Sequence, residues 1–316
     1  MDALSDVLAA VRLSGSAFLD AEFTSPWCVE AQVGADDCAV LGVSPAQVIA
    51  YHYVASGEMF VEMPGLEPLS VASGEILLLS RNDRHVLGSQ PHLRPAIINN
   101  LIRPPTEAMP ATLRHGGGGV ATHVICGYLG CEIPHNPLLA TLPPMLKLRV
   151  VDDVGDDWIG RSFAQAAAEF TRGGPGSATV LGKLAELLFV EAIRRYVATL
   201  PEEQTGWLSG LRDRAIGRAL ASLHARFAEN WTTEELAREV GLSRSAFAER
   251  FTTLIGVPPM HYLAQWRLQL AATRLRETAR ATAQIAYEVG YDSEAAFNRA
   301  FKRSFGTTPA AWRRRN

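Results

Sequence analysis

The sequence of 316 residues has no features that would place the protein in a membrane or outside the cell. No apolar run approaches the roughly 20 residues that a membrane-spanning helix needs. The first residues, Met1 to Asp6, are acidic and carry no basic segment of the kind that begins a secretory signal peptide. We therefore expect a soluble, cytoplasmic protein with no membrane partner.

Cysteine is also scarce. The four cysteines are Cys28, Cys38, Cys126 and Cys131, and none of them forms a C-x-x-C pair. In a cytosolic protein they should be thiols rather than structural disulfides. An oxidant-sensing role would need an exposed thiol with a lowered pKa, and the plainer alternative is that they are small buried residues.

Charge is unevenly distributed along the chain. Of the 30 basic and 33 acidic residues, 17 and 10 lie from Gly210 to the C-terminus, which leaves 13 and 23 in the preceding part. The hydrophobic content of 47% and the charged content of 20% are typical of a globular protein, and the length allows two domains. A basic part joined to an acidic part is common when a nucleic-acid-binding domain is attached to another domain.

Residues 1–150 are predicted to be rich in β-strands. Short apolar runs alternate with turn-forming pairs such as Ser56-Gly57, Pro64-Gly65, Ser73-Gly74 and Asn82-Asp83, a spacing that favours a small barrel or sandwich. The glycines from Gly116 to Gly119 lack the context of a phosphate-binding loop and indicate a flexible turn. The predicted strands are Val48–Val54, Met59–Met63, Ile76–Leu79 and Ala96–Ile98.

The next segment, 151–207, is predicted to be helical. One helix is expected over Asp157–Thr171 and a second over Ser177–Leu200, where Leu181, Leu184 and Leu188 recur near helical spacing. The second helix could form a homodimer contact or pack on the barrel of its own chain.

An internal repeat marks residues 208–316. Thr233, Leu236, Ala237, Glu239, Val240 and Gly241 recur 49 residues later as Thr282, Ile285, Ala286, Glu288, Val289 and Gly290. With one inserted residue, Phe247 and Phe251 recur as Phe297 and Phe301. A repeat this detailed predicts two similar structural units.

Each copy has the pattern of a helix-turn-helix, at about 231–254 and 281–304. Thr233 and Thr282 are expected to cap the first helices, which should end at Gly241 and Gly290. Ser243, and Asp292 or Ser293, are expected to cap the second helices. The predicted inward faces hold Phe247, Phe251 and Leu254 in the first copy and Phe297, Phe301 and Ser304 in the second.

The outward faces of the second helices carry side chains that suit DNA. Arg and Asn can read guanine and adenine edges through paired hydrogen bonds, and Glu can accept from cytosine. Met260–Arg276 is predicted to be one helix that holds the two units apart, and the terminal Arg313–Arg315 adds phosphate affinity. The predicted DNA-binding residues are Arg244, Ser245, Ala248, Glu249 and Thr252, and Glu294, Ala295, Asn298, Arg299 and Lys302.

The stretch from about Trp231 to Trp312 resembles the DNA-binding domain of the arabinose-regulator (AraC/XylS) family of transcription regulators. Its markers include Val240-Gly241-Leu242-Ser243, Gly256-Val257-Pro258-Pro259 and Phe305-Gly306-Thr307-Thr308-Pro309. The resemblance implies a protein that binds promoter DNA, acts on RNA polymerase, and commonly works as a dimer.

Residues 1–150 more loosely resemble the cupin-like sensor domain that one branch of this family carries. Gly74 and His85 match the second cupin motif, whereas Ser80 and Asn82 stand where that motif has a proline and a glycine. His52 resembles a histidine of the first motif. The resemblance implies a barrel that senses a small effector or a redox or metal signal. His52 and His85 are candidate ligands for a divalent metal, with His123, Cys126 or Cys131 as further ligands; the alternative is a hydrogen-bonded pair that binds nothing.

The fold class predicted overall is therefore a mostly-β, cupin-like barrel followed by an all-α domain with two helix-turn-helix units. The predicted function is sequence-specific transcription regulation, with no catalytic residues and no required cofactor. One alternative is a metal-dependent cupin enzyme carrying a DNA-binding tail, but the metal-ligand set is incomplete. Another is a DNA alkyl-repair protein, but the cysteines lack zinc-site spacing.

Overall fold

The computed structural model describes residues 4–5, 13–34, 48–96, 102–104, 110–131, 139, 141–150, 158–201 and 206–314. The chain divides into two units. One comprises Leu13–Pro134 and Leu142–Tyr196, and the other comprises Val197–Asn316 with the short segments Met1–Arg12 and His135–Thr141.

The described residues of the first unit form a β-barrel and two helices. Its described strands form a sheet of order β11-β6-β3-β10-β1-β9-β8 and a smaller sheet of order β2-β7-β4-β5. The elements are β1 (Leu13–Thr24), β2 (Cys28–Ala31), β3 (Val48–Ser56), β4 (Glu58–Glu62), β5 (Leu69–Ala72), β6 (Glu75–Leu79), β7 (His85–Gly88), β8 (Ile102–Arg103), β9 (Ala111–Gly116), β10 (Ala121–Cys131), β11 (Met145–Arg149), α4 (Trp158–Thr171) and α5 (Ser177–Thr199).

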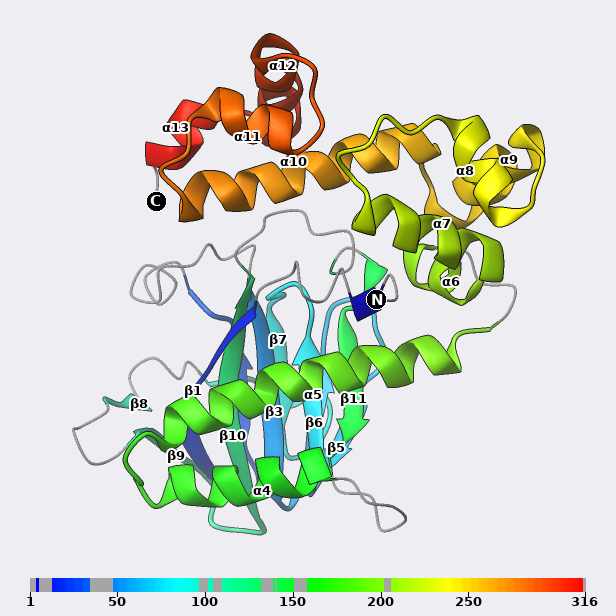
Figure 1. The fold of residues 1–316 in the computed structure, drawn as a ribbon. Helices are drawn as coiled ribbons and strands as arrows, with labels where there is room; N and C mark the ends of the chain where they lie inside the picture. The colour runs from blue at the N-terminus through cyan, green and yellow to red at the C-terminus, as the bar shows by residue number, and fades with distance from the viewer. Residues whose placement is uncertain are drawn as a thin grey trace. The chain divides into compact units, whose positions relative to one another are not determined.

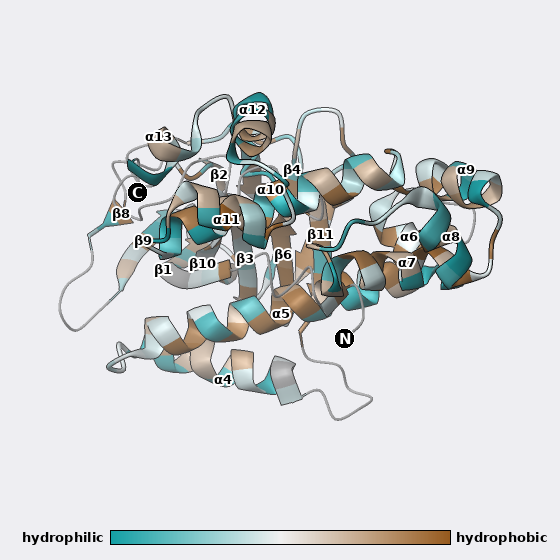
Figure 2. Cartoon of the chain, turned by 45° about the horizontal axis from the view of Figure 1, so that its top comes forward, coloured by the Kyte–Doolittle hydropathy of each residue, from teal (hydrophilic) through white to brown (hydrophobic). Residues whose placement is uncertain are grey.

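Alternation along the strands separates the two faces of the larger sheet. Ala50 and Val54 of β3 and Val124 of β10 belong to the barrel core, whereas the rings of Tyr51 and Tyr53 contact Phe163 of α4. Figure 1 shows α4 and α5 lying across the outer face of this sheet. All five residues of β6 are buried, as expected of a strand covered on both sides, and β6 is correspondingly brown in Figure 2.

Of the four predicted strands, Val48–Val54 lies within β3, Ile76–Leu79 lies within β6, and Met59–Met63 lies within β4 except for its last residue. Of the fourth, Ala96 forms an isolated bridge with Val29, and Ile97 and Ile98 lie outside the described residues. The predicted turns are present, with Gly57, Gly65 and Gly74 at positive φ.

The second helix of the 151–207 segment packs on its own sheet. The backbone N–H of Gly15 in β1 donates to Glu186 of α5 over 2.8 Å. Leu181, Leu188 and Ile193 are buried. A dimer through the remaining outer face of α5 stays a prediction.

The second unit is helical throughout its described length. It consists of α6 (Trp207–Arg212), α7 (Arg214–Ala225), α8 (Thr233–Val240), α9 (Arg244–Ile255), α10 (Pro259–Glu277), α11 (Thr282–Glu288), α12 (Glu294–Phe305) and α13 (Pro309–Arg314). The long helix predicted between the repeat copies is α10.

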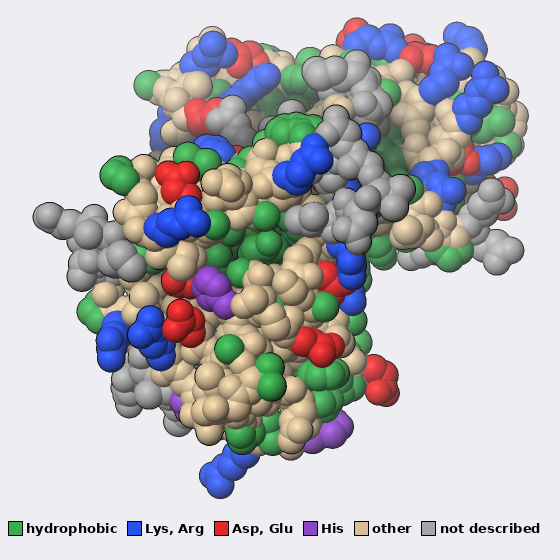
Figure 3. All heavy atoms as spheres, turned by 90° about the horizontal axis from the view of Figure 1, so that it is seen from below, with side chains coloured by type: hydrophobic (Ala, Val, Ile, Leu, Met, Phe, Trp, Pro, Cys, Tyr) green, Lys and Arg blue, Asp and Glu red, His purple; other side chains and the backbone are tan. Residues whose placement is uncertain are grey.

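Among the described residues, no helix is long and apolar enough to cross a membrane. The face drawn in Figure 3 carries Lys and Arg side chains interspersed with Asp and Glu.

Candidate nucleic-acid interface

The first helix pair, α8 and α9, has well-defined ends. Thr232 caps α8 through its hydroxyl, which accepts from the N–H of Glu235, while the Glu235 carboxylate accepts from the N–H of Thr232. The prediction that Thr233 is the cap was wrong by one residue, because Thr232 is the residue with extended backbone. Gly241 ends α8 at φ 76°, and Ser243 caps α9, as predicted.

The second pair, α11 and α12, has the same turn but a weaker start. Ala281 occupies the cap position of α11 and offers no side-chain hydrogen bond, so the prediction that Thr282 caps this helix was also wrong. Gly290 lies at φ 87°, and Ser293 caps α12 by accepting from Ala296 N. The second copy thus keeps the turn of the first but lacks its capping box.

Both second helices are held by aromatic cores. Phe247 and Phe251 are fully buried with ring centroids 5.6 Å apart, and Phe297 and Phe301 are fully buried at 5.5 Å. Ser304, which we predicted to face inward, is exposed. Phe305 takes that role and packs on Trp312 of α13 with ring centroids 5.0 Å apart.

The predicted DNA-binding residues lie on the opposite sides of α9 and α12. Two of the ten, Ala248 and Asn298, are half-buried. The Oδ1 atom of Asn298 is shielded from solvent and has no hydrogen-bond partner in the described part of the chain. The Thr252 hydroxyl donates to Ala248 O over 2.7 Å, so it is engaged within its own helix. The exposed members are Arg244, Ser245, Glu249, Thr252, Glu294, Ala295, Arg299 and Lys302.

One arginine on α9 has a role that the sequence did not reveal. Arg250 donates through Nε to Asp213 over 2.8 Å, and the same carboxylate caps α7. This ion pair ties α9 to the start of α7. The contact joins residues 37 positions apart, so helical periodicity alone gave no signal for it.

The repeated glutamates hold the first helix of each pair against the preceding helix. Glu239 of α8 accepts two hydrogen bonds from Arg226, at the end of α7. Glu288 of α11 accepts from Arg280 over 2.9 and 3.0 Å and from Arg274 of α10 over 3.4 Å. The return of Glu after 49 residues was the only sequence signal for these clamps.

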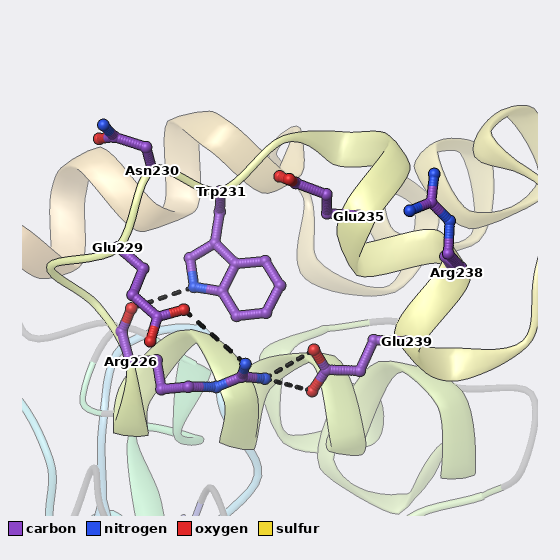
Figure 4. A pocket seen from close by; sticks show the side chains of 7 residues that line it. All are labelled: Arg226, Glu229, Asn230, Trp231, Glu235, Arg238 and Glu239. Carbon is purple, nitrogen blue, oxygen red and sulfur yellow. Dashed lines mark hydrogen bonds and ion pairs between the residues drawn. The ribbon is translucent and has the colours of Figure 1, made fainter.

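A groove lies beside α8, on the side where Arg226 stands. Figure 4 shows the Arg226 guanidinium between Glu229 and Glu239, with the Trp231 ring above it at 4.4 Å from Cζ. Carboxylates outnumber guanidinium groups in this groove, so it is poorly suited to phosphate. Its lining residues are Arg226, Glu229, Asn230, Trp231, Glu235, Arg238 and Glu239.

The two candidate metal ligands meet inside the barrel. His52 Nε2 and His85 Nε2 are 2.8 Å apart, His52 Nδ1 is 3.1 Å from Cys126 Sγ, and His85 Nδ1 is 2.8 Å from Asp83 O. A carbonyl only accepts, so neutral His85 donates through Nδ1 and accepts at Nε2. His52 must then donate through Nε2, and its Nδ1 accepts from the Cys126 thiol.

These four groups therefore form a hydrogen-bonded chain that uses every ring nitrogen. A divalent metal bonds imidazole nitrogens at about 2.0–2.1 Å and would have to replace the His52–His85 bond. Among the described residues, no three His, Cys, Asp or Glu side chains are placed so that they could hold one metal ion together. The donors do not fit a metal as they are arranged, and metal binding by His52 and His85 stays a prediction.

Burial sets the protonation of this chain. Burial lowers the pKa of His52 well below its usual value, with His85 adding to the effect, and burial also lowers the pKa of His85. Burial raises the pKa of the Cys126 thiol to about 12. At neutral pH the chain is uncharged, and Cys126 is not a thiolate.

The other candidate ligands lie elsewhere or outside the described residues. His123 is hydrogen-bonded to Asp20, which raises the pKa of the imidazole. Cys28 is a buried free thiol with a pKa raised by burial. Cys38 and the side chain of Cys131 lie outside the described residues.

A β-barrel followed by two helix-turn-helix pairs on a shared long helix defines a DNA-binding protein with an attached barrel domain. Residues 2–198 match the sequence profile of the cupin family, and residues 236–315 match that of a helix-turn-helix domain. A putative AraC-like transcription regulator of Streptomyces antibioticus is 31% identical over 271 residues, which cover 85% of this chain and 88% of the relative. The chain belongs to the AraC-like transcription regulators, with an N-terminal cupin domain.

A putative AraC-like transcription regulator of Streptomyces lividans is 29% identical over 99% of this chain and 98% of its own. The crystal structure of the DNA-binding domain of AdpA, a global transcriptional factor, in complex with a target DNA covers 32% of this chain and 91% of its own, with 28% identity and a TM-score of 0.31.

Proposed function

We propose that this DNA-binding regulator reads promoter DNA with α9 and α12, each placed in a major groove. The support is the pair of buried aromatic faces, which leave the opposite sides of both helices exposed. The 19-residue helix α10 is about 28 Å long and could separate the two units on one face of the duplex.

The regulatory part of the proposal concerns the barrel. A small molecule or a redox or metal signal acts on the N-terminal domain in the cytoplasm, and the protein then recruits or blocks RNA polymerase. We propose that the barrel senses rather than catalyses. This is supported by the relatives being regulators and by the mutual hydrogen bonding of the two motif histidines.

We also propose a homodimer through the outer face of α5. Val180 and Leu187 are seven residues apart on this helix and are 50% and 43% exposed. Large apolar side chains exposed at this spacing are typical of a helix contact. Sedimentation equilibrium should show a dimer that the Leu187→Glu substitution dissociates, and a wild-type monomer at all concentrations would refute this part.

The first test is selection of genomic fragments by the purified full-length protein at about 150 mM salt, with and without cell metabolites. Recovery of a motif with two elements about one helical turn apart would support reading by both helices. A shift in recovery with metabolites would show effector sensing. Recovery of unrelated fragments, with affinity that collapses as salt rises, would contradict sequence-specific reading by α9 and α12.

Arg299→Ala tests one reading residue. Arg299 is exposed on α12, and its loss should weaken binding by about 1–3 kcal/mol and relax base preference at one position of the selected motif. The exposed neighbour Arg303 serves as the control, because Arg303→Ala should weaken binding to all sequences alike. If Arg299→Ala also weakens all sequences alike, Arg299 contacts phosphate and the assignment is wrong.

A further inference from the structure

Arg267 of α10 donates hydrogen bonds to three backbone carbonyls from two distant segments. Its Nε atom lies 2.7 Å from Phe227 O, one terminal nitrogen lies 2.7 Å from Glu229 O, and the other lies 2.8 Å from Gly290 O. The side chain is half-buried. A guanidinium group can make these bonds together because its donors form a rigid planar fork.

The carbonyls belong to different helix-turn-helix units. Phe227 and Glu229 lie in the connection that leads from α7 into α8, whereas Gly290 lies in the turn between α11 and α12. Arg267 therefore joins the start of the first helix-turn-helix to the turn of the second, through the helix α10 that both share.

The same place shows close packing between the units. A Cβ atom added to Gly290 would be 2.8 Å from Ala228 O and 2.8 Å from Arg267 Cζ. The Phe227 side chain packs against the hydrophobic core of the second helix-turn-helix. Arg274 Cζ lies 5.5 Å from the centroid of the Phe227 ring. The connection before α8 therefore packs directly against the second helix-turn-helix.

The repeat provides an internal comparison. Arg218 of α7 stands 49 residues before Arg267 and points at the equivalent end of α8. It is exposed and donates to Glu239 O over 3.3 Å, within the first unit. Gly241, the counterpart of Gly290, has a similar positive φ of 76°, but an added Cβ would meet nothing within 4 Å. The bridge between units is therefore specific to the second copy.

We propose that Arg267 is a positioning residue for DNA recognition: it fixes the orientation of α12 relative to α9, so that both helices fit one spacing of operator elements. This inference rests on the proposal that both helices read DNA. A rigid pair gains affinity from the second element only at the matching spacing, whereas a loosened pair gains less and tolerates more spacings.

The test uses full-length Arg267→Lys, which keeps the positive charge but loses the planar fork. Arg218→Lys is the matched control. Binding is measured to the two-element duplex selected by the wild-type protein, to the same duplex with the second element scrambled, and to one lengthened by a base pair between elements. The inserted base pair turns the second element by about 34–36° around the duplex.

We expect Arg267→Lys to bind the two-element duplex about tenfold more weakly, to bind the scrambled duplex as the wild type does, and to lose less on base-pair insertion. Arg218→Lys should match the wild type on all three. Equal losses on the two-element and scrambled duplexes, or unchanged binding and spacing dependence, would overturn the role of Arg267. A wild-type protein indifferent to the second element would instead overturn reading by both helices.

A second variant approaches the contact from the other side and does not depend on the folding of Arg267→Lys. Gly290→Ala should reproduce the altered spacing dependence, because its Cβ would push on Arg267 and Ala228. Gly241→Ala carries similar left-handed backbone strain without that contact, so the difference between the two variants isolates the bridge. Equal spacing dependence in both glycine variants would contradict the inference.

Discussion

Acidification should destabilise the barrel through His52 and His85. Both imidazoles are buried and neutral, and both have a lowered pKa in the folded protein, so below about pH 6.5 the unfolded chain takes up protons at these positions before the folded chain does. Because the unfolded state then binds more protons, its free energy falls relative to the folded state. Stability from this pair is present above the unfolded pKa and decreases as the pH falls.

The size of the effect follows from proton linkage. For an imidazole of unfolded pKa near 6.5 that stays neutral when folded, lowering the pH from about 6.5 to 5.5 removes about 1 kcal/mol of unfolding free energy. His52 should therefore cost about 1 kcal/mol, and His85 adds to the loss in the same direction. His123 acts in the opposite sense, because its pKa is raised beside Asp20. Its contribution is present below the unfolded pKa and is lost as the pH rises through the folded one.

The assay is urea unfolding at the two pH values, with a brief deuterium pulse at one fixed pH to label unfolded molecules. Peptides from β3 and β10 report the barrel, and peptides from α9 and α12 report the helical unit separately. The double variant His52→Gln with His85→Gln keeps polar groups at both positions but cannot titrate there. The stability of its barrel should therefore change little between the two pH values. A wild-type barrel that loses no more stability than the double variant between the two pH values would mean that the pair takes up no extra protons on unfolding, and the reasoning would be wrong.

Two predictions concern local packing and capping. Ala281→Thr should stabilise the helical unit by about 1 kcal/mol in urea unfolding, because it would recreate at Gln284 the capping box that Thr232 forms in the first copy; no gain would show that α11 does not start at this residue. Gly15→Ala should lower the barrel's stability by about 1–3 kcal/mol, because the new Cβ would lie 2.2 Å from Gly182 O of α5. An unchanged thermal midpoint of the barrel would show that β1 and α5 do not approach so closely.

The repeat units could be predicted from sequence because their determinants are local. Gly241 and Ser243 act on their own helices, and the buried phenylalanines follow from helical spacing. The cap of α8 was misplaced because Thr232 and Thr233 are adjacent and both can accept from a helix N-terminus. Ser304 was misassigned because its side of α12 is exposed, whereas Phe305 meets Trp312 of α13, a contact that periodicity does not reveal.

The barrel was harder to predict because its contacts are distant in sequence. His52 meets Cys126, 74 residues away, only through the register of β3 against β10. His85 joins them from the smaller sheet. The motif residues were therefore identifiable, but their chemistry depended on strand pairing, and pairing turned two candidate metal ligands into members of a hydrogen-bonded chain.

The two copies of the repeat share a fold but are anchored by different helices. The first helix-turn-helix is held to α7 through Arg226 and Glu239. The second helix-turn-helix is held to α10 through Arg274 and Arg267. Because α10 also follows directly from the first unit, any shift of α12 relative to α9 must either break the Arg267 bridge or move the connection before α8. A signal that alters DNA binding while leaving both this bridge and the connection before α8 in place must therefore act on the two reading helices together.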